Sequence, residues 1–150
     1  MEEDLLRLGW NLEQLHGPVA AQMFHHAATM LGGEMSFSRV IALFHLSYRG
    51  PQTITSLAKE VMLSHAATSR MVDSLFKAGL LDRQERAQDR RQKLVAITPA
   101  GRKCIDTFRS LTADAYARSM AELPLELRAG LSSLIEEVIQ LRRPPPDPAA

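Results

Sequence analysis

Apolar residues recur at the three- and four-residue spacing of an α-helix along almost the whole chain, and this periodicity limits the possible folds more than any other feature. Only residues 81–86 and 92–98 have the composition of β-strands. The polar segment from Ala87 to Arg90 is expected to turn between them. The sequence therefore predicts a mainly α-helical fold with one small β-hairpin.

Glycine, proline and small polar residues mark where the helices begin and end. Gly17–Pro18 interrupts an N-terminal stripe of leucines, which predicts two helices or one kinked helix before Gly32–Gly33. Thr53 and Ser64 are suitable N-caps for two short helices, separated by Met62–Leu63. This pair predicts a helix-turn-helix, with the hairpin following it directly.

A helix-turn-helix followed by a hairpin is a winged helix-turn-helix, in which the second helix enters the major groove of DNA. One face of that helix carries its apolar residues and is expected to point inward: Thr68, Met71, Val72 and Leu75. The candidate DNA contacts lie at its start and on its opposite face: Ser64, His65, Ala66, Ser69 and Arg70. For His65 and Ser69, a solvated face without any ligand is the alternative.

Positive charge is concentrated in and after the hairpin, although the net charge of the chain is only +1. Residues 82–103 carry seven basic and three acidic side chains, whereas residues 1–34 carry one basic and five acidic. The charges alone leave two alternatives open, an anionic partner or a solvated hairpin. Beside a helix-turn-helix, they predict a DNA-binding wing: Arg83, Arg86, Asp89, Arg90, Arg91 and Lys93.

Within this wing, Arg91 is expected to enter the minor groove, where negative potential is enhanced, and Asp89 to steady it. The other cations would lie near phosphates, which fix the register of the protein on DNA and make its affinity dependent on salt.

The spacing Asp89-x-Arg91-x-x-x-Val95-x-Ile97-Thr98-x-x-Gly101 resembles the wing signature of the MarR family of bacterial transcription regulators. The upstream segments Thr53-x-x-x-Leu57-Ala58, Ser69-Arg70-x-Val72-Asp73 and Gly79-Leu80-Leu81-x-Arg83 also resemble that family's helix-turn-helix in order and spacing. The similarity covers about residues 34–101.

This resemblance implies a homodimer that binds a pseudo-palindromic operator, usually as a repressor. In many members a small aromatic or anionic ligand, or an oxidant, relieves binding. The resemblance also supports Ser64, His65, Ala66, Ser69 and Arg70 as recognition-helix contacts, and Asp89 with Arg91 as a wing pair. The single cysteine, Cys104, lies far from the N-terminus and is expected to be a small buried apolar residue rather than a redox sensor.

The C-terminal helix expected after Pro124 has a near-heptad apolar stripe that is wide enough to pack on a second subunit. The stripe consists of Leu127, Leu131, Leu134, Val138 and Leu141. Ordinary core packing within one chain is the alternative. The expected organisation is N-terminal dimerisation helices (1–34), a DNA-binding domain (35–98), C-terminal dimerisation helices (99–141) and a disordered tail (142–150).

The sequence lacks the motifs that other classes of function require. The sequence has no glycine-rich phosphate loop, nucleophile elbow or zinc-binding His-Glu-x-x-His motif, which predicts no catalytic site, metal or cofactor. The acidic N-terminus and the absence of a long apolar run predict a cytoplasmic protein without a membrane partner. The remaining alternative to a DNA-binding regulator is a winged-helix interaction module that docks an acidic protein.

Overall fold

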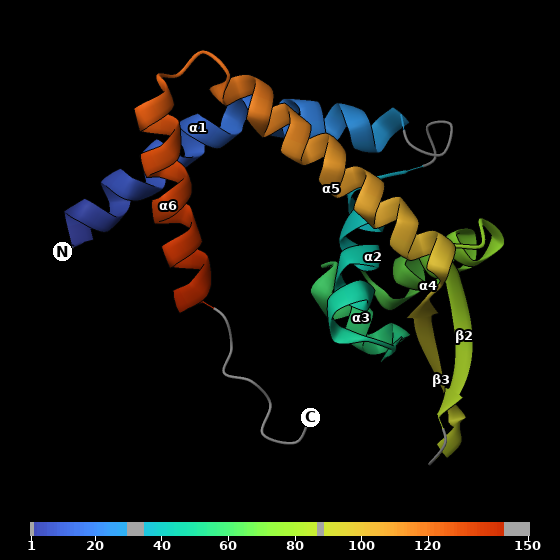
Figure 1. The fold of residues 1–150 in the computed structure, drawn as a ribbon. Coiled ribbons are helices and arrows are strands. Elements are labelled where there is room, and N and C mark those ends of the chain that lie inside the picture. Colours follow the sequence, from blue (N-terminus) through green and yellow to red (C-terminus); the bar gives the residue numbers. More distant parts are fainter. Residues whose placement is uncertain (1, 30–34, 87–88, 143–150) are drawn as a thin grey trace. The chain divides into compact units, whose positions relative to one another are not determined.

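The computed structural model of this 150-residue chain describes residues 2–29, 35–86 and 89–142, with the backbone alone at 85–86 and 89–93. Its elements are drawn in Figure 1. The described residues form a mainly helical fold with a small antiparallel sheet, which confirms the predicted fold class. None of the described helices is long and apolar enough to cross a membrane.

In chain order the elements are α1 (Glu2–Thr29), α2 (Phe37–Arg49), β1 (Gln52–Thr53), α3 (Ile54–Glu60), α4 (His65–Lys77), β2 (Leu81–Arg86), β3 (Asp89–Ile97), α5 (Pro99–Met120) and α6 (Leu125–Leu141). Contacts within the chain divide it into two compact units, Met1–Ala115 and Tyr116–Ala150. The second unit contains the end of α5 and the whole of α6.

The N-terminal leucine stripe lies on one continuous helix, α1, with Pro18 in its interior. The sequence left open whether there would be one helix or two, and the structure has one. Most of α1 is exposed, and only Val19 and Ala27 are buried. The stop expected at Gly32–Gly33 lies outside the described residues, as does most of the C-terminal tail, residues 143–150.

Hydroxyl side chains begin the helices α2, α3 and α4. Ser36, Thr53 and Ser64 each accept a hydrogen bond from the backbone N–H three residues later, at 3.4, 3.1 and 3.2 Å. An N-cap of this kind satisfies one of the amide groups left unpaired at the start of a helix. The predicted caps at Thr53 and Ser64 are confirmed, and Ser36 caps α2.

The sheet has three strands, in the order β1-β3-β2, rather than the two expected. The additional strand, β1, has only two residues and pairs Gln52 with Val95 and Thr53 with Leu94. A two-residue strand is too short to produce an alternating apolar pattern, so this strand could not be predicted from the sequence. The strand β3 also begins earlier than expected, at Asp89, with a register shift between Glu85 and Arg86.

One joint connects the end of α4, both ends of the hairpin and the start of α5. The hydroxyl of Thr98 donates to the carbonyl oxygen of Gly79 at 2.7 Å and accepts from the amide of Gly101 at 3.0 Å. The amide of Thr98 donates to the carbonyl of Leu80 at 3.1 Å. Gly79 has a φ of +71°, a conformation that glycine adopts without steric cost.

Gly101 is the residue that lets α5 approach this joint. A Cβ atom at that position would lie 2.3 Å from the carbonyl oxygen of Leu80 and 2.7 Å from Cγ1 of Ile97. The backbone carbonyl cannot move away without disturbing its hydrogen bond from Thr98. In the pattern Thr98-x-x-Gly101, the threonine therefore caps the start of α5, and the glycine allows α5 to lie close to the backbone of Leu80.

We predict that Gly101→Ala lowers the free energy of unfolding by about 1–3 kcal/mol, because the added methyl overpacks the joint. Urea denaturation followed by circular dichroism measures this change.

Gly130→Ala is the matched control, because a Cβ there meets no atom within 4 Å in this chain. Alanine has the higher helix propensity, so this variant should be as stable as the parent or more stable by up to about 1 kcal/mol. Equal stability of Gly101→Ala and the parent would contradict the close approach.

Candidate nucleic-acid interface

The turn between α3 and α4 is fixed by backbone hydrogen bonds. The amide of Val61 donates to Leu57 at 3.0 Å, and the amide of Leu63 donates to Ala58 at 3.1 Å. Met62 between them has a φ of +53°, so this short segment ends α3 in a left-handed turn. The predicted helix-turn-helix is therefore confirmed, and its turn sets the direction in which α4 leaves α3.

The inner face of α4 is the predicted one. Thr68, Met71, Val72 and Leu75 are all buried. The hydroxyl of Thr68 is fully buried but donates to the carbonyl of Ser64 at 3.0 Å, so it carries no unpaired polar group. This burial holds α4 against α3 and leaves its opposite face free of core contacts.

The predicted DNA contacts lie at the start of α4 and on its outer face. Ser64, His65, Ala66 and Arg70 are exposed, and Ser69 is half-buried. His65 and Ser69 are four residues apart, as are Ala66 and Arg70, so these side chains form two adjacent rows. The first amides of α4 also leave a positive helix end beside these rows, which suits a phosphate group.

Arg83 is held within the chain by two contacts from α4. Its guanidinium forms an ion pair with the carboxylate of Asp73 and lies 5.3 Å from the ring centroid of Phe76. Both charged side chains are nearly half exposed. This arginine was predicted as a phosphate contact of the wing. The structure shows it connecting β2 to α4, where it positions the hairpin relative to the helix.

The other predicted wing residues belong to the strands, but their side chains lie outside the described residues. Arg86 ends β2, while Asp89, Arg90, Arg91 and Lys93 lie in β3. The turn was expected to include Asp89 and Arg90, but the pairing of Arg86 with Asp89 brings both residues into the strand. Ala87 and Gln88 are outside the described residues.

A second set of ion pairs connects α2 with the end of α3. The carboxylate of Glu60 contacts a guanidinium nitrogen of Arg49 at 3.2 Å and Nδ1 of His45 at 3.6 Å. His45 on α2 therefore has a carboxylate partner on α3. Over the described ranges, no three His, Cys, Asp or Glu side chains are grouped to hold a metal ion.

Cys104 on α5 is half-buried and packs against the hydrophobic core. Burial raises the pKa of its thiol, so little of the reactive thiolate forms near neutral pH. Its environment matches the expected small apolar residue.

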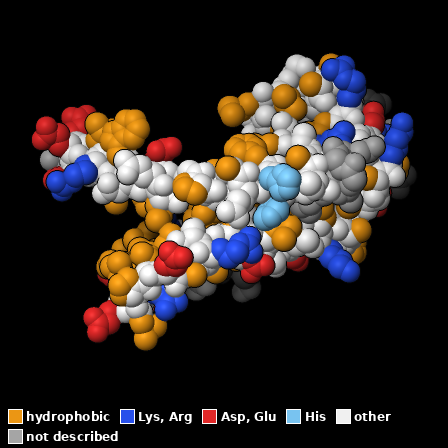
Figure 2. Space-filling view, turned by 90° about the horizontal axis from the view of Figure 1, so that it is seen from above, with side chains coloured by type: hydrophobic (Ala, Val, Ile, Leu, Met, Phe, Trp, Pro, Cys, Tyr) orange, Lys and Arg blue, Asp and Glu red, His pale blue; other side chains and the backbone are white. Residues whose placement is uncertain are grey.

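The apolar residues of the proposed dimerisation stripe are largely uncovered in this chain. Leu127, Leu134, Val138 and Leu141 are exposed, and Leu131 is half-buried. Helix α1 likewise exposes large apolar side chains, including Leu5, Leu8 and Trp10. Figure 2 shows exposed hydrophobic side chains gathered in clusters on the face that it displays.

The ion pair between Asp73 and Arg83 was not predicted from the sequence. The signal was present in the sequence, because Asp73 precedes the end of α4 and Arg83 is the third residue of β2. A hairpin that follows its helix after three residues returns alongside the last turns of that helix.

Comparison with known proteins agrees with this architecture. The MarR family model matches residues 36–93, which extend from the cap of α2 into β3. A curated protein of Bacillus subtilis, the uncharacterized HTH-type transcriptional regulator YcgE, is 33% identical over 108 residues, covering 70% of each chain.

Two solved structures are similar over almost their whole length. The crystal structure of RV1404 from Mycobacterium tuberculosis is 25% identical with a TM-score of 0.74, covering 98% of this chain and all of the other. A mutant of MepR from S. aureus, bound to an oligodeoxyribonucleotide, has a TM-score of 0.68 at 16% identity. That alignment covers 91% of this chain and 98% of MepR, and it shows similarity of fold alone.

We predict a coupling between Asp73 and Arg83 of about 0.2–1 kcal/mol in a double-mutant cycle of Asp73→Asn and Arg83→Gln, as expected for a half-exposed ion pair. Urea denaturation of the four proteins gives this value. Additive effects of the two substitutions would show that the contact contributes nothing to stability.

Proposed function

Because this chain belongs to the MarR family of winged helix-turn-helix transcriptional regulators, we propose that it binds a pseudo-palindromic operator as a homodimer and represses transcription. The observation that carries this proposal is the outer face of α4, which is polar and exposed to solvent and is followed in the chain by an arginine-rich hairpin. The start of α4 is capped by Ser64. In the proposed complex, the helix would read one groove of DNA while the cationic hairpin met the other.

In the proposed complex α4 enters the major groove. Arg70 has the planar guanidinium that pairs with two acceptors of guanine, and it is exposed in the middle of the helix. Ala66 presents a methyl group that suits a thymine methyl, while His65 and Ser69 offer short polar groups. Ser64 lies at the helix start, where backbone N–H groups can donate hydrogen bonds to a phosphate.

The wing supplies the second part of the proposed interface. Arg91 enters the minor groove with Asp89 steadying it, and Arg86, Arg90 and Lys93 lie near the phosphates. Arg83 is assigned a positioning role, because its guanidinium is already shared between Asp73 and Phe76. Sequence information would then come from α4, and much of the affinity from the wing.

A second copy of the chain is the proposed cover for the apolar faces of α1 and α6. No residue of α6 is buried, although large apolar side chains recur along it. Monomeric proteins rarely leave contiguous apolar patches of this kind in water. A two-fold dimer would also place two recognition helices one DNA turn apart, at about 34–36 Å.

A small effector, aromatic or anionic, is proposed to relieve DNA binding. Such a ligand can act only if it binds the DNA-competent and incompetent dimers with different affinities. The protein-interaction module considered as the alternative gains no support, because the chain belongs to a family of DNA-binding regulators.

We predict that Arg70→Ala and Arg91→Ala weaken binding in different ways. Fragments selected from genomic DNA by the parent protein provide the operator, and fluorescence anisotropy over a salt series gives the affinities. Arg91→Ala should lose about 1–3 kcal/mol and flatten the dependence of log K on log salt by about one unit. Arg70→Ala should lose a similar amount mainly on the operator, with little change on random DNA.

Arg142→Ala is the control for general loss of positive charge, because Arg142 is an exposed cation after the end of α6. It should bind operator as the parent does. If the salt dependence of Arg91→Ala equals that of the parent, the wing does not contact DNA through Arg91. If Arg70→Ala loses the same affinity on operator and on random DNA, Arg70 does not contribute to specificity.

We predict that Leu134→Glu converts a dimer into a monomer. Leu134 is 63% exposed in the single chain, so the substitution should leave the monomer folded while placing a charge in the proposed interface. Sedimentation equilibrium should give about 33 kDa for the parent, twice the 16.7 kDa of one chain, and half of that for the variant.

Ser133→Glu adds the same charge at the neighbouring exposed position and should remain dimeric. A monomeric parent protein would end the dimer proposal, and a dimeric Leu134→Glu variant would place the interface elsewhere.

A further inference from the structure

The end of helix α3 is connected to helix α2 through one carboxylate, and Figure 1 shows the two helices side by side. Glu60 is the last residue of α3. Its Oε1 accepts a hydrogen bond from Nη1 of Arg49 at 3.2 Å, and its Oε2 lies 3.6 Å from Nδ1 of His45. Because 3.6 Å is beyond hydrogen-bonding range, Arg49 is the principal partner. These three side chains are called the α2–α3 clamp below.

The clamp lies next to the turn that sets the direction of α4. Glu60 is followed at once by Val61–Leu63, whose first and last amides are hydrogen-bonded to the carbonyls of Leu57 and Ala58. The buried face of α4 then packs against α3. Because the turn and this packing join α3 to α4, a rotation of α3 relative to α2 would carry the recognition helix with it.

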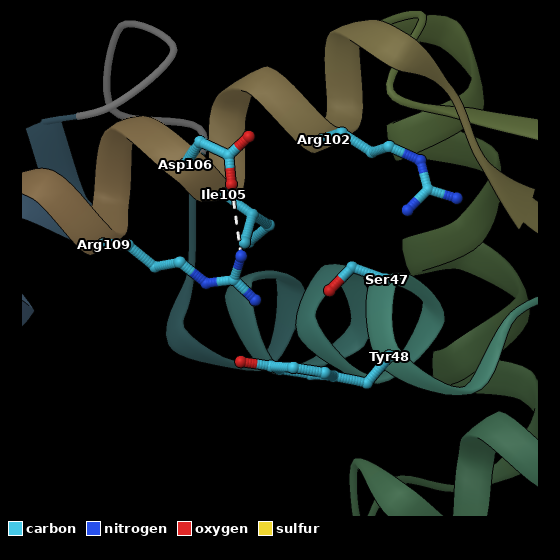
Figure 3. Close-up of a pocket in the computed structure, with 6 residues that line it drawn as sticks. All are labelled: Ser47, Tyr48, Arg102, Ile105, Asp106 and Arg109. Carbon is cyan, nitrogen blue, oxygen red and sulfur yellow. Dashed lines mark hydrogen bonds and ion pairs between the residues drawn. The ribbon is translucent and has the colours of Figure 1, made fainter. Parts of the chain in front are cut away.

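The last turn of α2 is also connected to α5. A cavity of about 190 Å³ lies between the two helices, and the guanidinium of Arg109 closes part of the gap. Its central carbon lies 4.9 Å from the ring centroid of Tyr48 on α2, and it donates to Asp106 at 3.1 Å. Figure 3 shows this contact among the residues that line the cavity: Ser47, Tyr48, Arg102, Ile105, Asp106 and Arg109. Charged side chains therefore connect the end of α2 to two elements, α5 and α3.

The clamp is too exposed to be a major source of stability. The side chains of Glu60 and His45 are each 28% exposed, and that of Arg49 is 63% exposed. Water screens ion pairs of this kind, so their net contribution is small. Buried residues of the common core, including Leu46 and Leu57, hold α2 and α3 together. Apolar packing is non-directional, whereas a carboxylate with two defined partners restricts the angle between the helices.

We propose that Glu60 is a positioning residue that fixes which spacing of operator half-sites the dimer accepts. The inference rests on the proposed function, because it requires a homodimer on a two-fold operator. The connection from the proposed dimer helix to the recognition helix runs through α2. Helix α1 packs on α2, and its residues Met23 and Ala27 belong to the common core. Helix α2 then holds Glu60, which precedes the turn into α4.

The spacing between half-sites is sensitive to this angle. One additional base pair moves the second half-site by about 3.4 Å along the duplex and rotates it by about 35°. A rigid dimer loses base contacts under both changes, whereas a dimer with a loosened α2–α3 angle can follow part of them. The loosened dimer also binds the native spacing less well, because its recognition helices are no longer preorganised. Both effects lower the ratio of affinity for native spacing to affinity for altered spacing.

The test uses operators that differ only at their centre. The operator selected by the parent protein has the native spacing, and insertion or deletion of one central base pair gives two altered spacings. Fluorescence anisotropy with the full chain gives the affinities, and their quotient is the spacing ratio. The parent should lose about tenfold on each altered operator, comparable with the cost of one mismatched base pair. Glu60→Ala should lose only about threefold, because its helices can follow the displaced half-site.

The spacing ratio separates positioning from a merely structural role. Partial unfolding lowers the active fraction of the protein by the same factor on every operator, and so does not change the ratio. The altered net charge of the variant likewise acts on all three operators alike. Arg49→Gln should lower the ratio as Glu60→Ala does, and the double variant should lower it no further, because both substitutions remove the same contact. Arg49→Lys keeps the charge and should restore the ratio of the parent.

Asp73→Asn is the matched control. It also removes a partly exposed carboxylate from an ion pair, but its pair with Arg83 joins α4 to β2 within one half-site. It should weaken binding to all three operators by the same factor and leave the spacing ratio unchanged.

A spacing ratio for Glu60→Ala equal to that of the parent would overturn the proposal, as would an equal fall in Asp73→Asn or a parent without any spacing preference. A parent that bound no DNA would overturn the proposed function together with this inference. A parent with a sharp spacing preference that Glu60→Ala shares would overturn the inference alone.

Discussion

The hydrogen-bonded joint at Thr98 is the constraint on which the arrangement of the DNA-reading elements depends. It ties the end of α4 to the end of β3 and to the first turn of α5 through one hydroxyl, one amide and one glycine without a side chain. Reading two grooves of one duplex requires a helix and a hairpin held at a fixed separation. The joint provides this fixed separation with one backbone hydrogen bond and with a single hydroxyl that is bonded to backbone groups on both sides.

The ion pair between Asp73 and Arg83 supports the same arrangement from the side of β2. It also means that the arginines of the hairpin differ in role. One near the base is engaged by α4, whereas those toward the tip are proposed to meet DNA. A cationic segment can thus be structural at one end and functional at the other, and the charge count of the sequence alone does not separate the two.

Much of this architecture follows from the sequence, because local signals and tertiary contacts agree. Thr53 and Ser64 cap the expected helices, and the buried face of α4 has the predicted residues. The strand β1 was missed because two residues produce no period. The partner of Arg83 was missed because its only signal is the short connection between α4 and β2, not a periodic pattern. The cavity beside Arg102 was missed because its lining combines residues of α2 and α5, which are far apart in the sequence.

The account as a whole claims that two copies of the chain place two helices and two wings on one duplex. Hydroxyl-radical footprinting of the selected operator tests this most directly, because it reports minor-groove and backbone protection at single-nucleotide resolution. The account predicts two protected half-sites related by two-fold symmetry, with centres about one helical turn apart and minor-groove protection in both. A single unpaired half-site, or protection confined to the major-groove side, would contradict it.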